Sequence, residues 1–214
     1  MRHACNPCGV PFIDPMPVDR LGEIYLANSY SDGTGEYGGK TSAVQKIKEA
    51  LDRKRFKRIL AAIPGEQLTV FDIGGGSGWL LDRLKSVDPR VTKTTVVDLD
   101  VGAAELVRAK GHTFMQGRIE DAELDTKLNF IRMRNLIEHV SGPRATPAKV
   151  RHLLKPGGEL FITPPNSMSL DARLFRHRSW AGFRTPRHFV MFHRRSLEAL
   201  VLECGLETLS FSYT

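Results

Sequence analysis

One short stretch combines residue types that could hold a small ligand with a positive charge. It reads VFDIGGGSG at Val70–Gly78 and joins an apolar run, the acid Asp72 and four glycines among five residues. Glycine lets the backbone turn tightly and approach a ligand closely. A second acid, Asp98, ends the next apolar run, where a carboxylate can accept both hydroxyls of a ribose. The pattern predicts a nucleoside-binding site.

Two other kinds of glycine loop are excluded by the residues around these glycines. A phosphate-binding loop requires a lysine and a hydroxyl after its last glycine, but Trp79 and Leu80 follow Gly78. The dinucleotide fingerprint requires a glycine where Trp79 stands. Asp72 ahead of the glycines disfavours an anionic pyrophosphate, so we expect a ligand that carries an ammonium or sulfonium group.

The elements around this stretch alternate between strand and helix patterns from about residue 41 onward. Such alternation predicts a Rossmann-like α/β fold, with a doubly wound, mainly parallel sheet in three α/β/α layers. Ligands bind at the carboxyl ends of such strands, where the glycines lie. The expected strands are Leu68–Ile73, Thr94–Leu99, His112–Gln116, Leu128–Met133, Glu159–Thr163 and Leu206–Tyr213. The expected helices are Thr41–Ile63, Gly78–Ser86, Gly102–Lys110, Pro147–Leu154 and Arg195–Cys204, with a turn at Lys155–Gly158.

The composition is that of a globular protein and narrows the function only partly. Of the 214 residues, 41% are hydrophobic and 26% are charged. No apolar run is long enough for a membrane span, and the N-terminus lacks the apolar core of a signal peptide. Three cysteines disfavour a disulfide framework, so we expect a cytoplasmic location. The net charge of +7 is compatible with nucleic acid, with an anionic substrate, or with solubility alone.

Taken together, these motifs resemble the class I S-adenosylmethionine-dependent methyltransferases. VFDIGGGSG is similar to the first motif of that family and VVDLD to the second, and QGRIED lies where the adenine is contacted. NFIRMRNLIEHV is similar to the fourth-strand motif and LLKPGGELFITPPN to the fifth. The resemblance implies S-adenosylmethionine as cofactor and S-adenosylhomocysteine as product.

The resemblance also implies a role for each matching position. It places the methionine part of the cofactor at Asp72, Gly74, Gly75 and Gly76, and the ribose at Asp98. The adenine would contact Leu99, Arg118 and Ile119, and Asn135 would face the cofactor. Two positions depart from the family. Arg118 stands where many relatives have an acid, so Glu120 or Asp121 would replace it, and Asn129 replaces the usual Asp of the fourth strand.

Candidate catalytic residues follow the fourth strand and lie near the C-terminus. An oxygen or nitrogen acceptor must lose a proton, for which histidine is suited. We expect Glu138 and His139 to serve this step or orient the substrate, with His188 as a second candidate; a structural role for either histidine stays open. In relatives that methylate phenolic or quinone hydroxyls, a Glu-x-x-Glu-His pattern can hold a metal. Asn135 replaces its first acid here, so we expect no metal.

An arginine-rich segment bears on the acceptor. Between Asp171 and Glu198 there are seven arginines and no acid. The segment Ser179–Arg195 resembles an insertion found in methyltransferases of sugars, sugar nucleotides and small metabolites. We therefore expect a small acceptor bearing a phosphate or carboxylate. The alternatives are an RNA-directed methyltransferase, a non-catalytic relative that only binds the cofactor, and a solvated surface without a ligand.

The first forty residues are expected to be irregular and separate from a cofactor-binding domain at residues 41–214. Cys5 and Cys8 resemble half of a zinc ribbon that precedes the catalytic domain in some relatives. Four-coordinate zinc needs two further ligands. We therefore expect a ribbon remnant without a complete zinc site, in a chain that looks shortened at both ends relative to the family.

Overall fold

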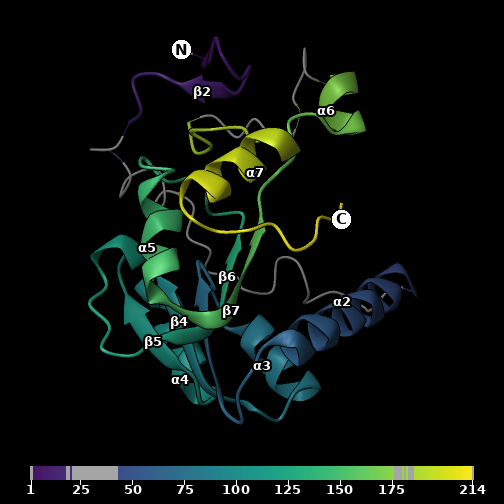
Figure 1. Cartoon of the computed structure of the whole chain (residues 1–214), viewed down its shortest axis with the longest axis vertical. Coiled ribbons are helices and arrows are strands. Elements are labelled where there is room, and N and C mark those ends of the chain that lie inside the picture. Colours follow the sequence, from purple (N-terminus) through teal and green to yellow (C-terminus); the bar gives the residue numbers. More distant parts are fainter. Residues whose placement is uncertain are drawn as a thin grey trace. The chain divides into compact units, whose positions relative to one another are not determined.

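A computed structural model describes residues 2–17, 20, 43–175, 180, 182 and 186–213. Strands and helices alternate through most of this part of the chain (Figure 1). The strands are β1 (Arg2–Ala4), β2 (Pro11–Ile13), β3 (Leu68–Ile73), β4 (Val91–Asp98), β5 (Thr113–Gln116), β6 (Leu128–Arg134) and β7 (Leu154–Thr163). The helices are α2 (Ala43–Ala62), α3 (Trp79–Val87), α4 (Ala104–Ala109), α5 (Ala145–Leu153), α6 (Leu170–Phe175) and α7 (Arg194–Glu203). No helix among the described residues is both long and apolar enough to cross a membrane.

Five strands form the central sheet in the order β5-β4-β3-β6-β7. β3 pairs in parallel with β4 on one side and with β6 on the other, and β4 pairs in parallel with β5. The strand order therefore reverses between β3 and β6, which is where ligands bind in sheets of this kind. The predicted Rossmann-like α/β fold is confirmed.

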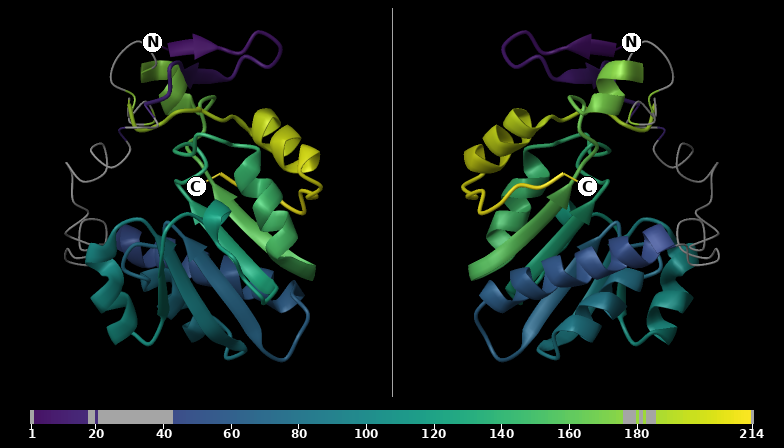
Figure 2. Two further views of the ribbon diagram at one scale, coloured as in Figure 1. Left: turned by 90° about the vertical axis from the view of Figure 1, so that its left-hand side faces the viewer. Right: turned by 90° about the vertical axis from the view of Figure 1, so that its right-hand side faces the viewer.

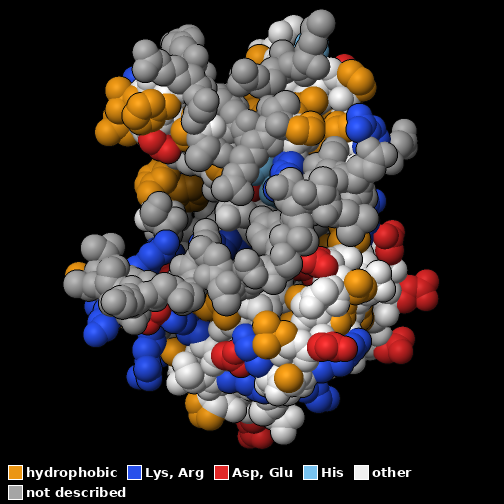
Figure 3. Space-filling model, turned by 180° about the vertical axis from the view of Figure 1, so that it is seen from behind, with side chains coloured by type: hydrophobic (Ala, Val, Ile, Leu, Met, Phe, Trp, Pro, Cys, Tyr) orange, Lys and Arg blue, Asp and Glu red, His pale blue; other side chains and the backbone are white. Residues whose placement is uncertain are grey.

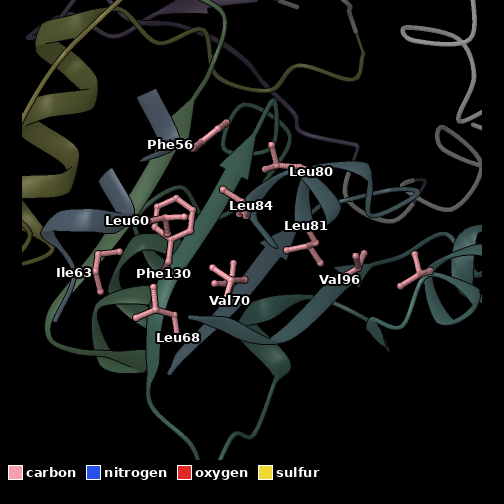
Figure 4. Close-up of a cluster of buried hydrophobic side chains, with 12 residues drawn as sticks. Phe56, Leu60, Ile63, Leu68, Val70, Leu80, Leu81, Leu84, Val96 and Phe130 are labelled. Atoms are coloured by element: carbon pink, nitrogen blue, oxygen red, sulfur yellow. The ribbon is translucent and has the colours of Figure 1, made fainter. Parts of the chain in front are cut away.

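The core of this sheet is built from apolar residues of α2, α3, α4, β3, β4 and β6. Figure 4 shows Leu60 of α2 and Ile63, which directly follows α2, close to Phe130 of β6 and Leu68 of β3. α2 crosses one face of these strands (Figure 2). Full burial of one such side chain contributes about 1.5–3 kcal/mol, so this cluster holds the strands that carry the glycine loop. The whole cluster is Phe56, Leu60, Ile63, Leu68, Val70, Leu80, Leu81, Leu84, Val91, Val96, Val107 and Phe130.

By its contacts the chain divides into two compact units. One comprises Ser29–Met133 and Leu153–Phe161, and contains the core just described. The other comprises Met1–Asn28, Arg134–His152 and Ile162–Thr214.

The N-terminal segment, expected to be irregular, contains an antiparallel hairpin of β1 and β2. Its second strand continues into pairing with a segment near the other end of the chain. Phe12 pairs with Val190, Ile13 N–H donates to the Phe189 carbonyl at 2.9 Å, and Met191 N–H donates to the Pro11 carbonyl at 2.9 Å. The hairpin is therefore an integral part of its unit, held by a partner that lies far away in the sequence.

Two expectations about the last third of the chain were wrong. Leu206–Tyr213 alternates like a strand, but no strand forms there, and most of these side chains are exposed. The turn expected at Lys155–Gly158 lies inside β7, with Gly157 at φ 73°. A Cβ at Gly158 would lie 3.0 Å from the carbonyl oxygen of Leu128, so this glycine allows a close approach to β6.

Asn129, the departure from the family at the start of β6, is 3% exposed and fully engaged by its neighbours. Its Oδ1 accepts the N–H of Thr69 at 3.0 Å and Lys155 Nζ at 3.0 Å, and its Nδ2 donates to the Pro64 carbonyl at 3.4 Å. Asn129 thus joins β6, β3 and β7 and has a structural role.

Replacement of Asn129 by alanine should lower the free energy of unfolding by about 1–3 kcal/mol, because the Thr69 N–H and the Lys155 ammonium lose their acceptor. Urea unfolding followed by circular dichroism measures this. The matched control is Asn129→Asp, which keeps the acceptor oxygen and loses only the weak Nδ2 hydrogen bond. The free energy of unfolding should therefore fall less in Asn129→Asp than in Asn129→Ala. Equal losses in the two variants would contradict this account.

Candidate functional site

The glycine loop between β3 and α3 runs through left-handed backbone at three positions. Gly74, Gly76 and Gly78 have φ values of 70°, 51° and 69°, a region that side-chain-bearing residues rarely adopt. Gly74 N–H donates to the Val97 carbonyl at 2.8 Å, which ties the loop to the end of β4. A Cβ placed on Gly76 would meet no heavy atom within 4 Å. The loop therefore faces open space at Gly76, as a ligand-binding loop must.

Asp98 lies at the end of β4, directly against this loop. Its Oδ2 accepts the N–H of Gly76 at 3.0 Å, and its Oδ1 accepts the N–H of Asp100 at 3.0 Å. Each carboxylate oxygen has a further lone pair, so a fixed and half-buried carboxylate can still accept hydroxyl groups. The sequence placed Asp98 beside the glycines, and the structure brings them together.

The expected adenine-contacting residues lie near Asp98 but differ in exposure. Leu99 is 50% exposed, which is unusual for an apolar residue directly after a buried strand and leaves it available to a ligand. Gly117 N–H donates to the Asp98 carbonyl at 3.0 Å and so holds the next segment against the end of β4. In that segment Arg118 is exposed, whereas Ile119 is buried and contributes its side chain to the core.

Asp72 is fully buried below the loop and bonded to an arginine of the neighbouring strand. Nη1 of Arg132 lies 2.8 and 3.1 Å from the two carboxylate oxygens, and the two residues are direct partners in the register of β3 and β6. A Cβ at Gly75 would lie 2.9 Å from the Asp72 carboxyl group. The absence of a side chain at Gly75 thus makes room for Asp72.

Two residues that hold the loop were not found from the sequence. Arg132 gave a signal, because a charged residue within an apolar strand needs a buried partner. His112 gave none. Its Nδ1 lies 2.8 Å from Thr94 Oγ1 and its Nε2 2.9 Å from Asp82 Oδ1, while its ring lies 3.1 Å from where a Cβ of Gly78 would be. His112 therefore supports the last glycine of the loop.

Asn135 follows β6 with a φ of 48°, and it is the non-glycine residue with positive φ among those described. Asparagine tolerates this conformation better than most residues. Its N–H donates to the Thr163 carbonyl at 2.9 Å and its side chain is exposed. The backbone therefore holds Asn135 in a fixed position at the end of the strand.

The three residues predicted for catalysis form one cluster in the structure. Potential ligand atoms of Glu138, His139 and His188 all lie within 4.8 Å of one another. His139 Nε2 lies 3.8 Å from Glu138 Oε1, and the two imidazole rings meet edge to face with centroids 4.6 Å apart. From the sequence, Glu138 and His139 were predicted as an adjacent pair and His188 as a separate candidate, whereas the convergence of all three is a finding of the structure.

Backbone hydrogen bonds hold this Glu-His-His cluster together. The Glu138 carbonyl accepts the N–H groups of Phe189 and Val190 at 2.6 and 3.3 Å, which joins the loop after β6 to the segment that pairs with β2. His139 Nδ1 lies 2.9 Å from the Arg187 carbonyl. His188 Nδ1 lies 2.7 Å from the Gly182 carbonyl. A carbonyl can only accept, so Nδ1 of each ring carries the hydrogen and Nε2 carries the lone pair of the neutral ring.

The Glu138 carboxyl group is the electrostatic anomaly of the cluster. Its side chain is about 1% exposed, and within the described residues neither of its oxygens has a hydrogen-bond partner. Burial raises the pKa of Glu138 to about 8, because the charged form is poorly solvated there. A buried carboxyl group in this state has a strong affinity for a proton or another cation.

The arginine-rich segment is described only in part, and Arg176, Arg178 and Arg184 lie outside the described residues. Arg194 donates to Glu198 at 2.9 Å and lies over the ring of Phe211. Arg173 and Arg195 are exposed. On the face in Figure 3, basic and acidic side chains occur together, so the described part of that face is not a uniformly basic surface.

Comparisons with known proteins agree with the motif order and the fold. A family model described as a methyltransferase domain matches residues 44–210. The chain is 34% identical over 133 residues to a ubiquinone biosynthesis O-methyltransferase of Xylella fastidiosa (strain 9a5c), covering 57% of this chain and 52% of the relative. It is 30% identical over 152 residues to the protein of that name from Xanthomonas axonopodis pv. citri (strain 306), covering 66% and 58%. The chain thus spans between half and two thirds of the length of these relatives.

A solved structure supports the fold independently. The structure of an O-methyltransferase family protein from Burkholderia thailandensis superposes with a TM-score of 0.58 at 19% identity, covering 92% of this chain and 64% of that one. At this identity the likeness concerns the fold alone. Because the family model matches more than half of the chain, the chain belongs to the class I S-adenosylmethionine-dependent methyltransferases.

Proposed function

We propose that this chain transfers the methyl group of S-adenosylmethionine to a hydroxyl oxygen of a small acceptor. The observation that carries the proposal is the Asp98 carboxylate, fixed by the N–H of Gly76 at a glycine loop that faces open space. An acid at the end of the second strand suits the ribose of a nucleoside. Oxygen as the acceptor atom is supported by the names of the relatives, which are O-methyltransferases.

The cofactor would be held mainly by backbone groups and by Asp98. The amides of Gly74–Gly76 would contact the methionine part. Asp72, held by its ion pair with Arg132, would support these amides from beneath the loop. Leu99 would cover the adenine, and the segment at Arg118 and Ile119 would lie along its edge. Asn135 stays a predicted contact of the cofactor, as the resemblance to the family implies.

Methyl transfer mainly requires positioning and the removal of one proton. When bound, S-adenosylmethionine supplies an electrophilic methyl carbon on a sulfonium. The acceptor oxygen bonds to that carbon as the carbon–sulfur bond breaks, and the electron pair stays on sulfur, which leaves as a neutral thioether. The hydroxyl proton must also leave. We propose that Glu138, His139 and His188 bind the hydroxyl group and that the Nε2 lone pair of His139 or His188 accepts its proton.

For the acceptor we favour a hydroxylated metabolite over a sugar or sugar nucleotide, since the relatives act in ubiquinone biosynthesis according to their names. Arg173, Arg187 and Arg195 are available to bind a phosphate or carboxylate on it, because arginine offers paired donors. The hairpin with Cys5 and Cys8, proposed as a ribbon remnant, would serve as support for the segment that carries His188.

Replacement of Asp98 by alanine should weaken S-adenosylmethionine binding by about 10- to 150-fold, because hydrogen bonds to a charged group contribute about 1.5–3 kcal/mol. Isothermal titration calorimetry measures this directly. Asp100→Asn is the matched control, since among the described residues its carboxylate accepts the Gly102 N–H in the same turn. Unchanged affinity in Asp98→Ala, or no binding by the wild type, would refute the cofactor site.

Replacement of His139 or His188 by alanine should lower kcat by about 10²- to 10⁴-fold while cofactor affinity is retained, as expected for groups that promote proton loss. Labelled-methyl transfer to a panel of phenols, sugar nucleotides and RNA measures the rate. His152→Ala, an exposed histidine of α5, is the control. Transfer to RNA with steep salt dependence, or cofactor binding without transfer to any acceptor, would contradict the proposal.

A further inference from the structure

We propose that Glu138, His139 and His188 bind a divalent transition-metal ion through two imidazole nitrogens and one carboxylate. The inference rests on the proposed function, because it states how the cluster would act on the acceptor hydroxyl. It also goes against the expectation from the sequence, in which Asn135 interrupted the acidic pattern for a metal. The difference is His188, which the structure brings beside Glu138 and His139 from another part of the chain.

The distances suit one shared ion. Nitrogen and oxygen ligands lie about 2.0–2.2 Å from zinc, so two ligands of one tetrahedral ion lie about 3.3 Å apart. The ligand atoms of the cluster all lie within 4.8 Å of one another, and Glu138 Oε1 lies 3.8 Å from His139 Nε2. Small side-chain rotations would bring all three onto one ion.

The two histidines are oriented as metal-binding histidines usually are. Metal-ligating histidines typically donate their second ring nitrogen to a carbonyl or carboxylate, which fixes the tautomer and the ring. His139 donates from Nδ1 to the Arg187 carbonyl and His188 donates from Nδ1 to the Gly182 carbonyl. In the neutral form both rings therefore have their lone pair at Nε2, and in His139 this is the nitrogen that lies 3.8 Å from Glu138 Oε1.

The Glu138 carboxyl group supplies independent evidence for a cation. It is almost completely buried, and both of its oxygens are without a hydrogen-bond partner among the described residues. Leaving a buried ionisable group uncompensated is costly, and buried charges usually occur paired or on a metal. A bound divalent ion would provide the missing compensation.

The ligand set favours some metals over others. Magnesium and calcium prefer ligand sets made of oxygen, whereas two imidazoles with one carboxylate suit zinc, iron, cobalt or manganese. Three protein ligands leave at least one position for a substrate atom, as in catalytic zinc sites. When bound, such an ion supplies Lewis acidity, which lowers the pKa of a hydroxyl group that contacts it.

The first experiment measures metal binding without reference to methyl transfer. The purified full chain is stripped with a chelator and dialysed, then titrated with Zn²⁺ and with Mg²⁺ by calorimetry, and with Co²⁺ by its visible absorption. We expect one equivalent of Zn²⁺ or Co²⁺, with the absorption of a low-coordinate site, and binding of Mg²⁺ at least about 100-fold weaker. Absence of stoichiometric Zn²⁺ and Co²⁺ binding, or a preference for Mg²⁺, would overturn the proposal.

Variants show whether the metal lies at this cluster. His188→Ala and Glu138→Gln should each weaken Zn²⁺ binding at least about 10-fold, whereas the control His152→Ala should bind as the wild type does. Glu138→Gln also serves as the test of folding. A neutral amide has no buried charge to solvate, so its metal-free Tm should equal or exceed that of the wild type, while the rise in Tm on adding Zn²⁺ disappears. Wild-type Zn²⁺ affinity in both variants would overturn the assignment.

The two proposals can fail separately. If the stripped protein methylates its acceptor at the full rate and binds no Zn²⁺, the metal proposal is overturned and the proposed function stands. If Zn²⁺ binds at the cluster but no acceptor is methylated in its presence, the metal site stands and the proposed function is refuted.

Discussion

The buried ion pair between Asp72 and Arg132 is the interaction on which the unit that contains the glycine loop depends. The two side chains face each other across β3 and β6, at the point where the strand order of the sheet reverses. Their position explains why residue 75 is a glycine. The Asp72 carboxyl group occupies the space that a side chain at Gly75 would need. Asp72, the acid of the glycine motif, thus packs beneath the loop and supports it. Removal of either Asp72 or Arg132 would leave an unpaired charge in the core.

The second unit is organised around a different constraint, the carbonyl of Glu138. This single oxygen accepts N–H groups from Phe189 and Val190, and β2 pairs along the same segment. Three stretches of chain that are distant in the sequence are thereby held side by side. The backbone hydrogen bonds around Glu138 hold its poorly solvated carboxyl group next to two imidazoles.

Features encoded by local patterns could be predicted from the sequence. The order of strands and helices follows from hydrophobic periodicity, and the approach of Asp98 to Gly76 follows from two parallel neighbours ending at one edge. Features that depend on contacts between residues distant in the sequence could not be predicted. The pairing of Asp72 with Arg132 requires the register of β3 on β6, and the support of Gly78 by His112 requires the packing of the loop. The hairpin was missed because β2 pairs with residues near the other end of the chain. Leu206–Tyr213 was wrongly predicted as a strand, because alternating apolar residues form a strand only where a partner strand is present.

The pairing of β2 with the segment around Val190 also has a consequence for biosynthesis. Residues 11–13 are translated well before residues 189–191. Contacts between such distant parts of a chain form late, because the entropy of closing a long loop must be overcome first. Before residue 188 is translated, the glycine loop and the strands around it already have their local partners. A nascent chain can therefore form the unit that contains the glycine loop before the Glu138, His139 and His188 cluster exists.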